Sequence, residues 1–129
     1  MRATIAAIGF LVSVSGPVGA AQFDGTYVGD RIAADNHPAC PSGEKGVTWR
    51  VTGNRVFKKW TGLYEKLPPI DVPIAPDGSF KSVTDFHEIA GGGMFVRTIT
   101  FSGRIVGDTF DAELIDQYCK YTYHLTRVQ

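Results

Sequence analysis

The sequence is poor in cysteine, in helical periodicity and in any excess of charge. Two cysteines in 129 residues are too few for a disulfide-dense scaffold. Thirteen basic residues balance thirteen acidic ones, which excludes the electrostatic footprint of a nucleic-acid partner or an anionic membrane. With 43% hydrophobic and 12% aromatic residues, the chain is too apolar to be disordered. Its length suits a single domain.

The first twenty residues predict a cleaved secretory signal. A positively charged start precedes an apolar stretch over residues 3–14, and Val18-Gly19-Ala20 offers small residues to signal peptidase. Cleavage one residue later satisfies the same rule. The apolar stretch is shorter than the roughly 20 residues of a membrane-spanning helix, and an N-terminal anchor is the alternative. We therefore expect an exported domain of residues 21–129, periplasmic or extracellular, with a charge of 12 − 13 = −1 and no integral membrane span.

Export would place Cys40 and Cys119 in an oxidising compartment, where cysteines pair. A redox-active thiol would be expected in a C-x-x-C motif, which the sequence lacks. We therefore predict a structural disulfide, Cys40–Cys119. Its loop spans 119 − 40 = 79 positions. In the chain-entropy account, closing a loop of that length stabilises the fold by about 4.5 kcal/mol.

Short runs of alternating apolar and polar residues fill the mature sequence, and turn residues interrupt them about every ten positions. Gly53-Asn54 and Gly107-Asp108 are typical of two-residue hairpin turns, and Pro76-Asp77-Gly78 is typical of a tight turn. Residues 91–93, three glycines, are interpreted as a flexible joint. We expect strands over residues 26–32, 47–52, 55–61, 70–74, 80–86, 94–102, 109–115 and 119–126.

This pattern predicts an all-β fold, an antiparallel meander of about eight strands closed into a small barrel, because closure removes exposed edges. A β-sandwich is the alternative, since the strand period is the same in both architectures. The last strand would turn Tyr121, Tyr123 and Leu125 inward. The disulfide would hold the two ends of the sheet together, because Cys40 follows the first strand and Cys119 opens the last.

Asp24–Tyr27, at the start of the first expected strand, and Leu125–Arg127, at the end of the last, resemble the two ends of calycin-type barrels, the lipocalin and avidin relatives. In that family an arginine stacks over a tryptophan near the closed end. The resemblance implies a cation–π contact of Arg127 with Tyr27, which stands in place of the tryptophan. The F-D-G-T-Y opening and C-x-Y ending also resemble small secreted β-barrel proteins of proteobacteria, a resemblance that implies no function.

Catalytic and metal-binding residues form no pattern in the sequence. His37, His87 and His124 lack the spacing of metal ligands. The sequence contains no G-x-S-x-G motif, and the three glycines lack the lysine of a phosphate-binding loop. We therefore expect no enzymatic activity, no cofactor and no metal.

Two basic residues, Lys58 and Arg97, occupy positions with apolar parity, where a closed barrel would turn them inward and an unpaired charge is costly. One interpretation is a ligand cavity in which Lys58 or Arg97 meets an anionic group between the walls Trp49 and Trp60. The other is structural. Arg97 would pair with an internal aspartate, Lys58 would reach solvent at the rim, or a bulge would shift the parity.

Phe57 is the reverse case, an apolar residue on a face of its strand that is otherwise polar. Together with Tyr64 it would form an exposed protein-contact patch, unless the proline-rich loop 67–74 covers it. The sequence therefore favours a monomeric, exported, non-catalytic binding protein for a small anionic or amphipathic ligand or an envelope component. The alternative is a periplasmic inhibitor or protein-interaction module, by analogy with exported barrels that inhibit metalloproteases or lysozyme. The S-G-x-x-Y loop of the lysozyme group is absent, because Arg104-Ile105-Val106 follows Ser102-Gly103 without the tyrosine.

Overall fold

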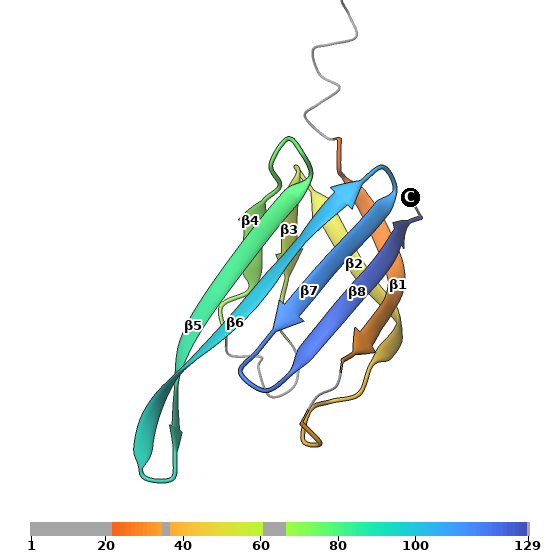
Figure 1. The fold of residues 1–129 in the computed structure, drawn as a ribbon. Coiled ribbons are helices and arrows are strands. Elements are labelled where there is room, and N and C mark those ends of the chain that lie inside the picture. Colours follow the sequence, from red (N-terminus) through yellow and green to blue (C-terminus); the bar gives the residue numbers. More distant parts are fainter. Residues whose placement is uncertain (1–21, 35–36, 61–66, 129) are drawn as a thin grey trace, which may run out of the picture.

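The structure is a computed structural model, and it describes residues 22–34, 37–60 and 67–128. The expected signal segment lies outside these residues. Within them the fold is all-β, with eight antiparallel strands and no helix (Figure 1). The strands are β1 (Gly25–Ala33), β2 (Glu44–Thr52), β3 (Arg55–Lys58), β4 (Ile70–Pro73), β5 (Ser79–Ala90), β6 (Gly93–Val106), β7 (Thr109–Ile115) and β8 (Lys120–Arg127).

One sheet contains all eight strands, in the order β4-β3-β2-β1-β8-β7-β6-β5. The first and last strands are therefore hydrogen-bonded neighbours, in a register that runs from Tyr27 opposite Arg127 to Ala33 opposite Tyr121. The two edge strands, β4 and β5, are consecutive in the chain, and the short connection between them keeps the two edges of the sheet near each other. The sheet therefore curls into a nearly closed barrel (Figure 1). The barrel expected from the sequence is confirmed.

Tight hairpins set the register between consecutive strands. Gly53 and Asn54 both have positive φ, as a type I′ turn requires, and they pair Val51 with Val56 as expected. Residues 91 and 92 also have positive φ and join β5 to β6, which pair as far as Ala90 opposite Gly93. Of the three glycines expected as a flexible joint over residues 91–93, the first two form this hairpin turn, and Gly93 begins β6.

The hairpin of β5 and β6 is longer than expected and forms an arm. β7 pairs with β6 over the part from Thr100 to Val106, whereas the pairing with β5 continues to Gly93. The outer part of the hairpin therefore projects past the lower edge of the barrel in Figure 1. Met94 and Val96 on this arm, and Val83 at its base, are exposed.

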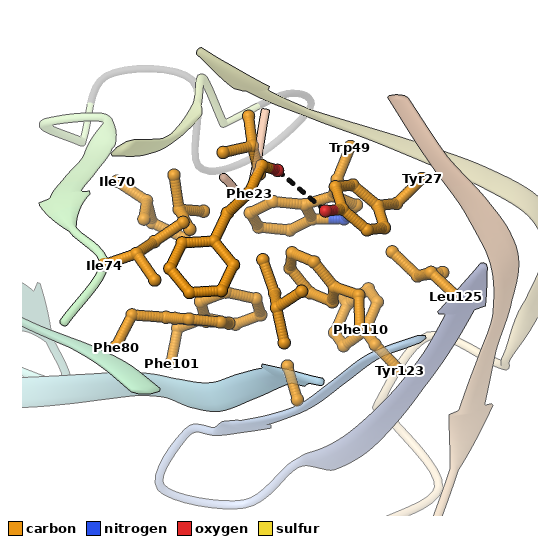
Figure 2. Close-up of a cluster of buried hydrophobic side chains, with 14 of the residues drawn as sticks. Phe23, Tyr27, Trp49, Ile70, Ile74, Phe80, Phe101, Phe110, Tyr123 and Leu125 are labelled. Carbon is orange, nitrogen blue, oxygen red and sulfur yellow. Dashed lines mark hydrogen bonds between the residues drawn. The ribbon is translucent and has the colours of Figure 1, made fainter. Parts of the chain in front are cut away.

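Alternation along the strands buries one cluster of large side chains inside the barrel (Figure 2). Phe110 packs against Tyr27 at 5.4 Å and against Phe80 at 5.2 Å between ring centroids. Each such side chain, when fully buried, contributes about 1.5–3 kcal/mol through the hydrophobic effect. The inward positions predicted for Tyr121, Tyr123 and Leu125 are confirmed, because all three are buried.

The core fills the end of the barrel where the turns 53–54, 74–78 and 107–108 lie, the upper end in Figure 1 and hereafter the closed end. Phe23 enters the cluster here, and its carbonyl accepts a hydrogen bond of 2.7 Å from the Tyr27 hydroxyl (Figure 2). The segment before β1 is also tied to the first hairpin, because the Asp24 carboxylate accepts hydrogen bonds from the backbone N–H groups of residues 53 and 54.

Arg127 holds the closed end together. Its guanidinium carbon lies 5.3 Å from the centroid of the Tyr27 ring, so the expected cation–π contact is present. Nη1 donates to the carbonyls of Gln22 and Asp24, at 3.2 and 2.9 Å, and Nη2 donates to the Gly107 carbonyl at 2.9 Å. One side chain thus links the N-terminal segment, the last strand and the β6–β7 turn. The relation to calycin-type barrels stays a prediction.

We expect Arg127→Met to lower the free energy of unfolding by about 2–4 kcal/mol, because it removes a partly buried cation–π contact and leaves three carbonyls without their charged donor. Urea denaturation followed by tryptophan fluorescence measures this loss. Arg104→Met is the matched control, because its exposed guanidinium bonds only to Asp77 among the described contacts. If both variants lost the same free energy of unfolding, the contacts of Arg127 would stabilise the fold no more than those of an exposed arginine.

Candidate functional site: a cavity at the open end of the barrel

The opposite end of the barrel, hereafter the open end, contains a cavity of about 460 Å³. Every described strand except β5 contributes to its wall, and the volume lies within the usual range of small-molecule sites. The wall combines aromatic and charged side chains: Arg31, Glu44, Trp49, Lys58, Lys59, Trp60, Asp116, Tyr121 and Tyr123.

Trp49 separates this cavity from the hydrophobic core. Its indole stacks on the Phe101 ring with the centroids 4.5 Å apart, and Tyr123 meets it edge-on at 5.7 Å. Trp49 is 3% exposed and belongs to the core cluster, yet it also lines the cavity. A rigid aromatic surface therefore forms the floor on which a ligand would rest.

Lys58 lies in the cavity wall together with Trp49 and Trp60, the grouping that its parity predicted. Its Nζ donates to the Thr48 carbonyl at 2.8 Å and lies 5.5 Å from the centroid of the Trp49 ring. The Trp60 indole donates to the Pro68 carbonyl at 2.7 Å, which fixes that ring at the edge of the cavity. These three residues come together as a site that mixes charge and aromatic surface.

Arg97 does not line the cavity and has a structural partner instead. Its Nε and Nη2 donate to the two carboxylate oxygens of Asp116, at 2.8 and 2.6 Å, and the Asp116 side chain is 4% exposed. This is the internal aspartate of our second interpretation. The fork geometry satisfies two buried charges at once, and it fastens the base of the arm to the β7–β8 turn.

Arg31 is a cavity residue that the sequence analysis missed. Its Nη2 donates to the Ser42 carbonyl at 2.7 Å, and its guanidinium carbon lies 4.7 Å from the centroid of the Tyr121 ring. The nearest Glu44 oxygen is 3.9 Å from Nη2. Tyr27, Gly29 and Arg31 alternate along the first strand and therefore share one face of it. Because Tyr27 was expected to face inward, the same alternation could have predicted an inward position for Arg31.

The disulfide forms part of the rim of the cavity. The predicted Cys40–Cys119 bond is confirmed, with a Cα–Cα distance of 5.8 Å. It joins the β1–β2 connection to the β7–β8 turn, and the Tyr121 hydroxyl reinforces it by donating to the Pro41 carbonyl at 2.6 Å. The expectation that it holds the ends of the sheet together is wrong, because β4 and β5 are the ends and hydrogen bonds already join β1 to β8.

The Tyr123 hydroxyl lies beside the Arg31 guanidinium inside the cavity. Burial raises the pKa of Tyr123 above its ordinary value of 10.0, and the positive charge of Arg31 opposes this shift. Burial is the larger effect, so the neutral phenol is favoured in the folded protein.

The remaining candidate residues lie elsewhere. Phe57 is 47% exposed, and Tyr64 lies outside the described residues, so their contact patch stays a prediction. His124 is bonded to Asp111, and the ring of His37 lies 6.2 Å from that of Tyr118. Among the described residues, no three side chains of His, Cys, Asp or Glu are grouped to hold a metal ion. The described part of the chain also contains no helix long and apolar enough to cross a membrane.

No protein-family model, curated protein or solved structure matches this chain. The cavity and its lining are therefore the features from which a function is proposed.

Replacing both cysteines, in Cys40→Ala/Cys119→Ala, is expected to lower the free energy of unfolding by about 4.5 kcal/mol, through the entropy that the unfolded chain regains. Chemical denaturation of the oxidised protein and of the double variant measures the difference. Wild-type protein treated with a reductant should behave like the variant. A double variant as stable as the oxidised protein would contradict the prediction.

The raised pKa of Tyr123 predicts a loss of stability in alkaline solution. A group whose pKa is higher in the folded than in the unfolded state contributes its full stability below its unfolded pKa, and it loses this contribution as the pH rises through the folded pKa. The free energy of unfolding should therefore fall above about pH 10, and Tyr123→Phe should make the fall shallower. Urea titrations between neutral and strongly alkaline pH measure both slopes.

Tyr118→Phe is the control, because that side chain is 62% exposed. It should leave the alkaline fall close to that of the wild type. Identical slopes in all three proteins would show that Tyr123 is not responsible.

Proposed function

We propose that this protein is an exported, non-catalytic binding protein that holds a small anionic or amphipathic ligand in the cavity at the open end of the barrel. The observation that carries the proposal is the placement of the Lys58 ammonium group beside the Trp49 ring in a cavity of about 460 Å³. Sites for small ligands combine aromatic walls with a few placed polar groups in this way.

The charges in the wall support an anionic ligand. Three cations, Arg31, Lys58 and Lys59, and two carboxylates, Glu44 and Asp116, line the cavity. Arg97 already neutralises Asp116 from outside the cavity. The remaining balance is positive, which favours a negatively charged ligand over a cation.

Export and a monomeric state belong to the same proposal. The Cys40–Cys119 disulfide fits an oxidising compartment such as the periplasm or the cell exterior. The ligand is then a molecule of the cell envelope or its surroundings.

Native mass spectrometry of the mature protein, purified mildly from its own envelope, tests the proposal. We expect the protein to carry a bound mass of a few hundred daltons. Lys58→Met should lose most of this mass while its melting temperature changes little, because the ammonium group is at the open end and bonds to one backbone carbonyl. Lys81→Met on the outside of β5 is the matched control.

A protein-sized addition would instead favour the inhibitor or interaction module. The proposed function would be contradicted if native spectra showed a monomer without bound ligand and if the protein also failed to bind small amphiphiles.

A further inference from the structure

Arg31 is a cation of the cavity whose hydrogen-bonding capacity is only partly used. A guanidinium group carries five N–H donors in a rigid fork. The Ser42 carbonyl accepts from Nη2 at 2.7 Å, and the Tyr123 hydroxyl lies beside the group. The Glu44 carboxylate, 3.9 Å from Nη2, lies beyond hydrogen-bond distance, and its side chain is 60% exposed. The buried Nε has no hydrogen-bond partner.

The second observation concerns the floor of the same cavity. The Trp49 indole nitrogen is also buried without a hydrogen-bond partner, in a side chain that is 3% exposed. In the part of the chain that the structure describes, Arg31 Nε and Trp49 Nε1 are the buried side-chain atoms left in this condition. Both are donors, and both belong to residues that line the cavity. These two atoms are themselves buried, so a ligand with anionic oxygens would accept hydrogen bonds from the exposed part of the Arg31 side chain, which is 23% exposed.

The position of Arg31 suits a planar oxyanion. The Tyr121 ring, 4.7 Å away, holds the guanidinium group in place, and an arginine fork matches a carboxylate with two parallel hydrogen bonds. Lys58 reaches the cavity from β3 and Arg31 from β1, on the two sides of β2. An anionic head at Arg31 would therefore leave the rest of the ligand to run along the aromatic surface of Trp49 and Trp60.

The local charge at Arg31 gives a doubly charged head little advantage. Glu44 partly offsets Arg31, so the second negative charge of a phosphate ester would gain little there, whereas it would cost more to remove from water. A carboxylate would take up the open part of the fork at a lower cost.

We propose that the ligand of this cavity is a carboxylate-bearing amphiphile and that Arg31 binds its carboxylate. This inference rests on the proposed function, because it names the chemistry of the ligand that the cavity would hold.

Calorimetric titration of the mature protein, freed of any bound ligand, tests it with decanoate, decanol and decyl phosphate. These probes share one apolar chain and differ in the head. We expect decanoate to bind at least tenfold more tightly than either of the others. Arg31→Met should weaken decanoate binding by about tenfold to a hundredfold, the range for a lost charged hydrogen bond. It should change decanol binding less than twofold.

Arg55→Met is the matched control, because it removes the same charge from an arginine on β3 that bonds to Asp71 on the surface. Its decanoate binding should equal that of the wild type. Arg31→Lys keeps the charge but not the fork, and it should recover only part of the lost affinity. This variant also carries the test if Arg31→Met fails to fold.

Different failures have different meanings. Equal binding of decanoate and decanol by the wild type, or equal weakening of both by Arg31→Met, would overturn the carboxylate inference and leave a ligand cavity in place. Tighter binding of decyl phosphate would overturn it in favour of a phosphorylated ligand. If none of the probes binds and the protein from the envelope carries no ligand, both this inference and the proposed function fail.

Discussion

The pairing of β1 with β8 is the constraint on which the rest of the structure depends. It joins the half of the sheet made by β1–β4 to the half made by β5–β8, and it thereby brings Trp49 of one half onto Phe101 of the other. Gly29 makes the pairing possible, because a Cβ atom there would lie 2.0 Å from the His124 carbonyl oxygen. A residue without a side chain is needed at the middle of the strand that closes the barrel.

The same closure produces two chemically different ends. At the closed end Phe23 packs into the interior and Arg127 covers it through its contacts with Asp24 and Tyr27. At the open end the wall consists of cations, carboxylates and aromatic rings around empty space, and a disulfide stabilises its rim. Trp49 belongs to both regions. The rigid core can thus support a site whose own groups are not fully satisfied, which is the usual arrangement for binding.

Much of the fold could be predicted from the sequence, because alternation and turn residues are local signals. They gave the strands, the hairpin at Gly53-Asn54 and the inward face of β8. They also placed Lys58 beside Trp49. What they could not give is which inward residues face one another across the barrel. The Arg97–Asp116 pair joins a strand to a turn 19 positions away, and Asp116 lies outside any alternating run. The importance of Arg31 depends on Tyr121 and Ser42, which only the closed sheet brings to it.

The order of the strands also has a consequence for the sequence of events in folding. Neighbouring strands in the sheet are consecutive in the chain, with the exception of β1 and β8. In that pair Tyr27 lies opposite Arg127, which is 127 − 27 = 100 residues later in the sequence. Local hairpins form early and non-local pairs late, because a long loop must close before its contacts are gained. β1, the first of the described strands, therefore pairs with β8, the last of them, only after the strands between them are in place. Until that strand arrives, the edge of β1 is open, and neither the aromatic floor nor the rim of the cavity can be completed.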